Sequence, residues 1–431
     1  MSQMTPRPGP HLGQVLMPLS PLLAAVGMVV VGVGLLFSVM GIRAHLAAFS
    51  SLTLGLVMSA YYVGFLLGSH LCPPLIRRIG HIRAFAAMAS MASTVPILHA
   101  IWVNPWYWGG LRLLTGLCVM GMYVVIESWL NTAAPSNQRG KVFGAYMVVC
   151  SVAGAVGQWL ILLGDKSSFV PFALVSIVFS FALIPITLSP QDEPDVEAAP
   201  PFSLRRLFQV SPLGVVGVAA AGVLNGAFFG MGAAFAQGAG LSDKNVASFM
   251  GATILGGALF QWPVGHYSDK HDRRLVLFWV CLVGAGLAVA AYFATTMVKE
   301  SLIEESLILL GLLLGGMLFS VYGLSVAYVN DLIEPEEVVE ITTGLLLMYG
   351  AGAVLGPALA GLVMSAFENA DFMLFLAAVM GLVAVYVLRR LPSSRAAAKP
   401  EKADYVLSGQ GSPSVVKLDP RGQAQRPTQS P

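Results

Sequence analysis

Two ionisable residues, Arg112 and Glu127, fall inside long apolar stretches of this 431-residue sequence. A charge in such a stretch is costly to bury, so it generally binds a solute, moves a proton or pairs with another group. Arg112, in "GGLRLLTGL", would lie about 9 Å along its helix from Trp106. We therefore treat Arg112 as a candidate for solute contact or for tuning a proton site. The alternative is a strut bonded to backbone carbonyls.

Glu127 would lie about 22 Å further along the same helix, near its far end. It is a candidate carboxylate for proton coupling, but this depth favours a salt bridge to a nearby cation. The cations in reach are Arg77, Arg78 and Arg83. With Glu127 paired in this way, no carboxylate remains at mid-membrane. Proton coupling then stays open, alongside facilitated movement and exchange.

Motifs of catalysis and cofactor binding are missing from the sequence. It has no H-E-x-x-H or G-x-S-x-G segment, no paired carboxylates in an apolar stretch and no phosphate-binding loop. The cysteines at 72, 118, 150 and 281 form no C-x-x-C pair, so we interpret them as small apolar packing residues. We predict that the chain is not an enzyme and binds no cofactor, metal or nucleic acid.

The elements that must position these residues are membrane-spanning helices. The chain is 56% hydrophobic and 11% charged, with a mean hydropathy of +0.75. A bilayer core needs roughly 20 apolar residues per helix. Continuous Leu, Ala and Gly runs of this length exclude the alternating pattern of a transmembrane barrel. The sequence therefore predicts an all-α membrane protein with twelve spans, near residues 18–41, 52–76, 83–103, 106–129, 141–164, 169–189, 212–236, 247–268, 275–297, 306–329, 339–366 and 371–391.

Lys and Arg residues are unevenly distributed between the two sets of loops. One set, with the segment after the last span, carries thirteen, and the other set carries four. Because positive loops stay inside, both termini are predicted to be cytoplasmic in a multi-pass protein of the inner or plasma membrane. The segment "FSLRRLF" favours a polar connector over a short amphipathic helix. The predicted regions are a cytoplasmic segment (1–17), a first six-helix half (18–189), a linker (190–211), a second half (212–391) and a disordered cytoplasmic tail (392–431).

The two halves repeat one another. "AGAVGQ" at 153–158 matches "AGAVLGP" at 351–357 with an offset of 198, and Asn131 matches Asn330 with an offset of 199. The loops "PPLIRRIGHIR" and "GHYSDKHDRR" match with an offset of 192. Three matches at nearly one offset indicate an internal duplication, which is common in transporters.

A 6+6 duplication with a charged loop after spans two and eight resembles the major facilitator superfamily. The second-half loop is similar to the family pattern Gly-x-Leu-x-Asp-Arg-x-Gly-Arg-Arg, but the first half has Pro73 at the Gly position and Arg77 at the Asp position. "IESWLN" and "QRG" resemble the YcaD-like branch. The matching second-half residues are Gly265, Ser268, Asp269, Lys270, Asp272, Arg273 and Arg274.

This resemblance implies a secondary active transporter that moves a small organic solute by alternating access. Such a protein would work as a monomer surrounded by lipid. The alternative is a transport-inactive receptor or sensor that kept the fold. In the family, spans one, four, seven and ten line a central cavity. The candidate cavity or coupling residues are therefore Arg112, Thr115, Tyr123, Asn225, Tyr322 and Ser325, which suit a small organic anion or zwitterion.

The resemblance also implies a cytoplasmic gate between the halves. Asp269 would meet Arg139 and Lys141 at the start of span five. The first-half arginines would meet acids near the start of span eleven, at 331, 334, 336, 337 and 340. Alternatively, the arginines only set topology and the acids are solvated. The candidate gate comprises Arg77, Arg78, Arg83, Glu127, Arg139, Lys141, Asp269, Arg273, Arg274, Glu337 and Glu340.

Overall fold

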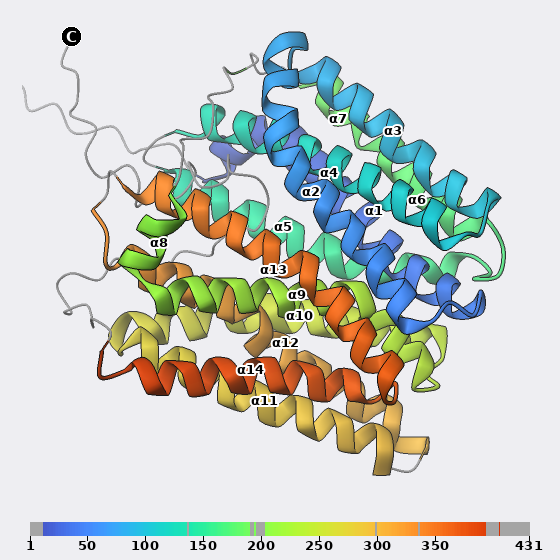
Figure 1. The fold of residues 1–431 in the computed structure, drawn as a ribbon. Coiled ribbons are helices and arrows are strands. Elements are labelled where there is room, and N and C mark those ends of the chain that lie inside the picture. Colours follow the sequence, from blue (N-terminus) through green and yellow to red (C-terminus); the bar gives the residue numbers. More distant parts are fainter. Residues whose placement is uncertain are drawn as a thin grey trace, which may run out of the picture.

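The computed structural model describes residues 12–135, 138–189, 194, 203–297, 300–334, 337–393 and 405. Within these ranges every regular element is a helix (Figure 1). The helices are α1 (Leu12–Leu46), α2 (Ser51–Ile79), α3 (His81–Ile101), α4 (Pro105–Ala133), α5 (Arg139–Trp159), η2 (Leu160–Leu163), α6 (Val170–Phe181), α7 (Leu183–Thr187), α8 (Leu204–Val210), α9 (Pro212–Gly238), α10 (Asp243–Lys270), α11 (Arg273–Met297), α12 (Glu300–Asn330), α13 (Val338–Ala366) and α14 (Asp371–Arg390).

Length and apolar composition let these helices cross a membrane. Eleven spans of the described chain qualify, with α6 and α7 counted together as one. The twelfth, α10, has 28 residues but is less apolar, because Gln261 and several small or polar residues interrupt it. Large apolar side chains such as Trp262 and Phe293 lie exposed on the outer surface, where lipid would cover them. The chain is thus a multi-pass membrane protein, and the predicted all-α fold with twelve spans is confirmed.

Local sequence signals fix several helix starts. The Ser50 hydroxyl accepts a hydrogen bond from the Thr53 N–H at 3.1 Å and begins α2. Asn104 accepts from the backbone N–H of Trp106 at 3.0 Å and begins α4, with proline in the first turn. Ser211 begins α9 in the same way. These caps satisfy backbone groups that a helix end would otherwise leave unpaired.

The helices form two halves joined by α8 (Figure 1). In the first half α2 packs on α4 and α1 on α5; in the second half α10 packs on α12 and α9 on α13. Contacts between the halves are made by α2 with α13, α5 with α10 and α1 with α9. The segment expected to be a polar connector instead contains α8, because Ser203 caps a helical turn and Leu207 is buried.

We call the end of the bundle with the turns at 77–83, 139–141 and 270–274 the arginine-rich end, and the other end the opposite end. At the opposite end the halves touch closely. Gly55 of α2 lies directly against the Pro357 carbonyl of α13, so any side chain at Gly55 would overlap it. Lys166 binds Asp243 across the halves at 2.8 Å. The Trp159 ring of α5 lies on Gly251 of α10. These contacts close the opposite end.

Candidate functional site

A cavity of about 260 Å³ lies between the two halves. Its walls come from α1, α2, α4 and α5 on one side and α9, α10, α12 and α13 on the other. Aromatic rings dominate these walls, and six of the nine come from the first half. The second half contributes Phe229, Phe319 and Tyr349, and the first half contributes Phe37, Tyr61, Tyr62, Phe65, Tyr123 and Tyr146.

The polar groups of the cavity are uncharged. Besides the tyrosine hydroxyls, they include Ser69, Ser151, Gln158 and Gln261, and none of the lining residues that the structure describes is charged. Gln158 accepts a hydrogen bond from the Ser38 hydroxyl, and the Gln261 amide donates to the Phe319 carbonyl at 3.1 Å. These bonds hold the two amide groups at the wall, where they add uncharged polar groups to the aromatic lining.

Arg112 lies behind this wall rather than on it. Its guanidinium carbon is 4.3 Å from the ring centre of Phe37 and 4.7 Å from that of Tyr61. The side chain is fully buried, and within the described residues its Nε and Nη2 atoms have no hydrogen-bond partner. Cation–π attraction offsets part of the cost of burying this charge. The sequence led us to expect that Arg112 faces the solute, but in this arrangement its side chain does not line the cavity.

The other predicted cavity residues divide between the wall and the layer behind it. Tyr123 lies on the wall. Asn225 donates to the Tyr349 hydroxyl at 3.1 Å, and the Tyr322 ring packs edge-on against Tyr349 at 5.0 Å, so both support a lining residue. The hydroxyls of Thr115 and Ser325 donate to carbonyls of their own helices, and both side chains are buried.

Glu127 is an acidic residue that is fully buried in the bundle. It accepts a hydrogen bond from the Tyr146 hydroxyl of α5 at 2.5 Å, and Tyr146 lines the cavity. The three arginines predicted to pair with it are exposed and form no salt bridge within the described ranges. Glu127 is thus linked to the cavity wall through the Tyr146 hydroxyl.

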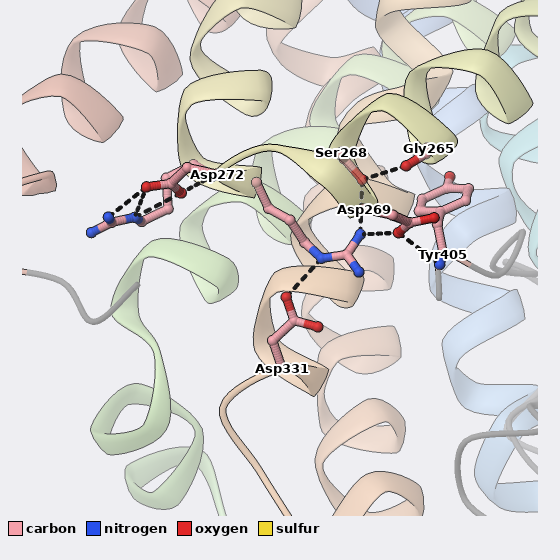
Figure 2. Close-up of polar contacts among 8 residues, drawn as sticks. Gly265, Ser268, Asp269, Asp272, Asp331 and Tyr405 are labelled. Atoms are coloured by element: carbon pink, nitrogen blue, oxygen red, sulfur yellow. Dashed lines mark hydrogen bonds and ion pairs between the residues drawn. The ribbon is translucent and has the colours of Figure 1, made fainter. Parts of the chain in front are cut away.

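The charged turn after α10 is held together by Arg273, and Figure 2 shows its partners Ser268, Asp269 and Asp331. Its guanidinium donates to Asp331 of α12 at 2.7 Å and to the Ser268 hydroxyl at 2.8 Å. It also lies 3.1 Å from Asp269, and the Arg273 and Asp331 side chains are each 1% exposed. The turn therefore joins α10, α11 and α12 through one buried cation.

The neighbouring pair in this turn begins α11 and reaches α14. Arg274 binds Asp272 with two nitrogen atoms, at 3.0 and 2.6 Å. Its backbone N–H donates to the same carboxylate at 3.0 Å, which stabilises the first turn of α11. A further bond runs from Arg274 to the Leu391 carbonyl after α14 at 3.1 Å. Arg273 and Arg274 therefore serve the second half itself.

Two of the remaining gate candidates, Asp269 and Glu337, contact residues other than those expected. Asp269 accepts from the Tyr405 backbone N–H at 2.8 Å. Glu337 binds Arg206 of α8 at 2.6 Å, and this hydrogen bond lowers the pKa of Glu337 below its ordinary value. Lys141 is exposed and Glu340 half-buried, while Arg139 donates to the Ala134 carbonyl at 3.4 Å. Glu336 lies outside the described residues.

Sequence reasoning missed most of the aromatic wall and the position of Tyr405. The segment "YYVGF" at 61–65 carries three of the lining rings and was a visible signal. Gln158, the last residue of the repeated segment "AGAVGQ", lines the cavity between the halves. Tyr405 belongs to the predicted disordered tail, whose other residues from 394 onward lie outside the described part. No hydropathy pattern marks such a contact in advance.

Comparison with known proteins gives a consistent result. A sequence profile of the Major Facilitator Superfamily matches residues 22–324 and 247–427. An uncharacterized MFS-type transporter of Enterobacter sp. (strain 638) is 26% identical over 346 residues, covering 78% of this chain and 86% of that protein. The uncharacterized MFS-type transporter YcaD of Salmonella arizonae is 25% identical over 341 residues, with the same coverage. The predicted resemblance to the YcaD-like branch is confirmed.

Solved structures share the fold at low sequence identity. The nucleoside transporter NupG superposes with a TM-score of 0.70 at 14% identity, covering 88% of this chain and all of NupG. A bacterial homologue of the human lysosomal transporter Spinster, in an inward-facing and occupied conformation, superposes with a TM-score of 0.71 at 12% identity. That match covers 91% of this chain and 99% of the homologue.

Proposed function

The chain belongs to the Major Facilitator Superfamily, and on this premise we propose that it is a secondary active transporter that moves a small organic solute by alternating access. The observation that carries the proposal is one uncharged, aromatic cavity between two repeated halves that meet closely at one end. When two such halves rock against each other, the pocket between them can open to one side of the membrane and then to the other.

Alternating access implies two arrangements, each open at one end of the bundle. The contacts at the opposite end support the arrangement that is closed there. Gly55 packs on Pro357, the Ser59 hydroxyl donates to the Val354 carbonyl at 2.6 Å, and Lys166 binds Asp243. At the arginine-rich end, Arg77, Arg78 and Arg83 are exposed. This pattern fits a cavity that opens at the arginine-rich end, which faces the cytoplasm by the distribution of positive charge. The membrane is then the inner or plasma membrane.

The cavity chemistry favours an uncharged, aromatic or heteroaromatic solute with several hydrogen-bonding groups. Rings such as Phe37, Phe229 and Phe319 offer faces and edges for stacking. Gln158 and Gln261 provide amides that donate and accept. A charged solute would leave its charge unpaired here, since the described lining residues carry none. The nucleoside named for the structural neighbour NupG meets this description, although that likeness extends to the fold alone.

Proton coupling would fall to Glu127, whose hydrogen bond to Tyr146 links a buried carboxylate to the cavity wall. Loss or gain of a proton at Glu127 would change this bond and hence the position of Tyr146. An imposed proton gradient should then accelerate solute uptake in the native protein, whereas Glu127→Gln should keep exchange of solute and lose the acceleration. Equal acceleration in both proteins would assign Glu127 a structural role.

The test of function starts from the purified protein. A thermal-shift screen with pools of neutral aromatic metabolites should find a stabilising class, because a ligand far above its Kd raises stability. Phe229→Ala should weaken this binding about tenfold by removing a stacking surface. The matched control is Phe293→Ala, which removes the same ring from the exposed outer surface of α11.

Saturable uptake of the identified solute into liposomes would establish transport. Specific binding without flux in well-folded protein would favour the transport-inactive receptor instead. Stabilisation by organic anions alone, abolished in Arg112→Ala, would contradict the uncharged cargo class and place a cation in the solute site.

A further inference from the structure

Tyr405 lies against the charged turn after α10, although 136 residues of sequence separate it from Asp269 (Figure 2). Its backbone N–H donates to Asp269 Oδ1 at 2.8 Å. Its side chain is half-buried and packs against the hydrophobic core of the bundle. The backbone hydrogen bond and the packed ring together hold Tyr405 at a defined site.

Two glycines on different helices create the space for the ring. A Cβ at Gly265 of α10 would overlap the Tyr405 ring, and a Cβ at Gly323 of α12 would overlap its hydroxyl. Both glycines are buried within helices, where glycine costs about 1 kcal/mol relative to alanine. Alanine at either position is therefore incompatible with the docked ring. The gap between α10 and α12 has the shape of this aromatic side chain.

Docking also occupies a carboxylate that the gate would use. Asp269 Oδ1 already lies 3.1 Å from Arg273, and the Tyr405 N–H takes a second position on the same oxygen. The expected partners from the first half, Arg139 and Lys141, begin α5 at this same end. For them to reach Asp269, Tyr405 would have to leave or share the carboxylate.

We infer that Tyr405 acts as an intramolecular clamp. Docked between Gly265 and Gly323, it blocks the first half from closing on Asp269 and so favours the arrangement seen here, with the arginine-rich end open. Release of Tyr405 frees Asp269 for the closed arrangement. This inference rests on the alternating access proposed above, and it adds a regulatory contact to that cycle.

The test measures the separation of the two halves at the arginine-rich end. Spin labels are placed at two exposed positions, Ala87 on α3 and Leu275 on α11, in a full-length background without the four native cysteines. The labelled protein that retains Tyr405 should show mainly the long distance between the two labels. Tyr405→Ala should increase the short-distance population roughly tenfold, because the packed ring that holds the backbone N–H against Asp269 is lost. Tyr405→Phe, which keeps the ring, should change it less.

Gly265→Ala provides the matched test from the other side of the contact. It should expel the ring and raise the short-distance population as Tyr405→Ala does. In the double variant the new methyl group enters vacated space, so the two effects should not add. Additive effects would show that Gly265→Ala acts on the helix rather than on Tyr405. Thermal midpoints of the labelled proteins control for folding.

The outcomes separate the clamp from the transport cycle. Two distance populations whose ratio is the same in every variant would overturn the clamp while leaving alternating access intact. One population that is the same in every variant, even with bound solute, would contradict both. A decrease of the short-distance population in Tyr405→Ala would mean that docking favours closure, which is the reverse of the inference.

Discussion

After α10, the Arg273 guanidinium binds Asp331 of α12 and Asp269 of its own turn. After α2, the equivalent place at the offset of 192 holds His81, whose ring bonds the Ser128 hydroxyl of α4 at 3.1 Å and packs near Trp129. Both side chains join the turn to a helix of the same half, and both are buried. One does so with a buried ion pair, and the other with a hydrogen bond to a hydroxyl group and with ring contacts.

Because of this difference, the two turns also differ in how their charged residues are paired. In the second half the cations at 273 and 274 have acidic partners within the half. In the first half Arg77, Arg78 and Arg83 are exposed, without a salt bridge in the part of the chain that the structure describes. Duplicated turns have thus diverged, one into a brace and the other into a surface of cations suited to the gate.

Arg273→Ala gives the largest expected effect. It leaves the buried Asp331 carboxylate without its cation, so we expect a loss of about 3–5 kcal/mol in the free energy of unfolding. His81→Ala should cost only about 1–3 kcal/mol, because it removes a hydrogen bond to a hydroxyl group and ring packing. The difference is measured by comparing the free energies of unfolding of the two purified variants.

The double variant Arg273→Leu with Asp331→Leu sharpens the same prediction. Replacing both charges by apolar groups should recover most of the stability, since the cost lies in the orphaned charge. Equal losses for Arg273→Ala and His81→Ala would remove the distinction between the two turns.

Neutralising the first-half cations should affect the gate but not the fold. In the combined variant with Gln at 77, 78 and 83, stability should change by less than about 0.5 kcal/mol, because these side chains are exposed. The short-distance population between labels at Ala87 and Leu275 should fall about threefold, opposite to the effect of releasing Tyr405. Arg389→Gln, at an exposed position on α14, is the control. An unchanged distance distribution would mean that the cations only set topology.

The salt bridge between Arg206 and Glu337 gives the smallest expected effect, since Arg206 is half exposed. Its hydrogen bond lowers the pKa of Glu337, so the contribution is full above the ordinary value of about 4.3 and is lost as the pH falls through the lowered value. Thermal midpoints of the native protein and Arg206→Gln should differ equally at about pH 8 and pH 6 and converge only below about pH 4. Convergence already at about pH 6 would assign the difference to another group.

The sequence by itself determined the spans, the duplication and the position of the charged turns. These features depend on composition along the chain, because any run of about 20 apolar residues is stable in a bilayer whatever lies beside it. The close packing that the glycines near Pro357 permit is also a local property. Gly352 and Gly356 lie against carbonyls of α9, and Gly361 lies against that of Ser51 in α2. Small residues allow such contacts in any membrane bundle.

Only the tertiary structure decided which faces meet. Helical spacing places Arg112, Thr115 and Tyr123 on one face of α4, but of the three only Tyr123 lines the cavity. The rings that cover Arg112 come from α1 and α2, and no pattern within α4 contains that information. Tyr405 shows the same limit, because its site is built by glycines on two other helices. Contacts between segments distant in sequence depend on packing geometry, whereas hydropathy reports only the preference of each segment for lipid.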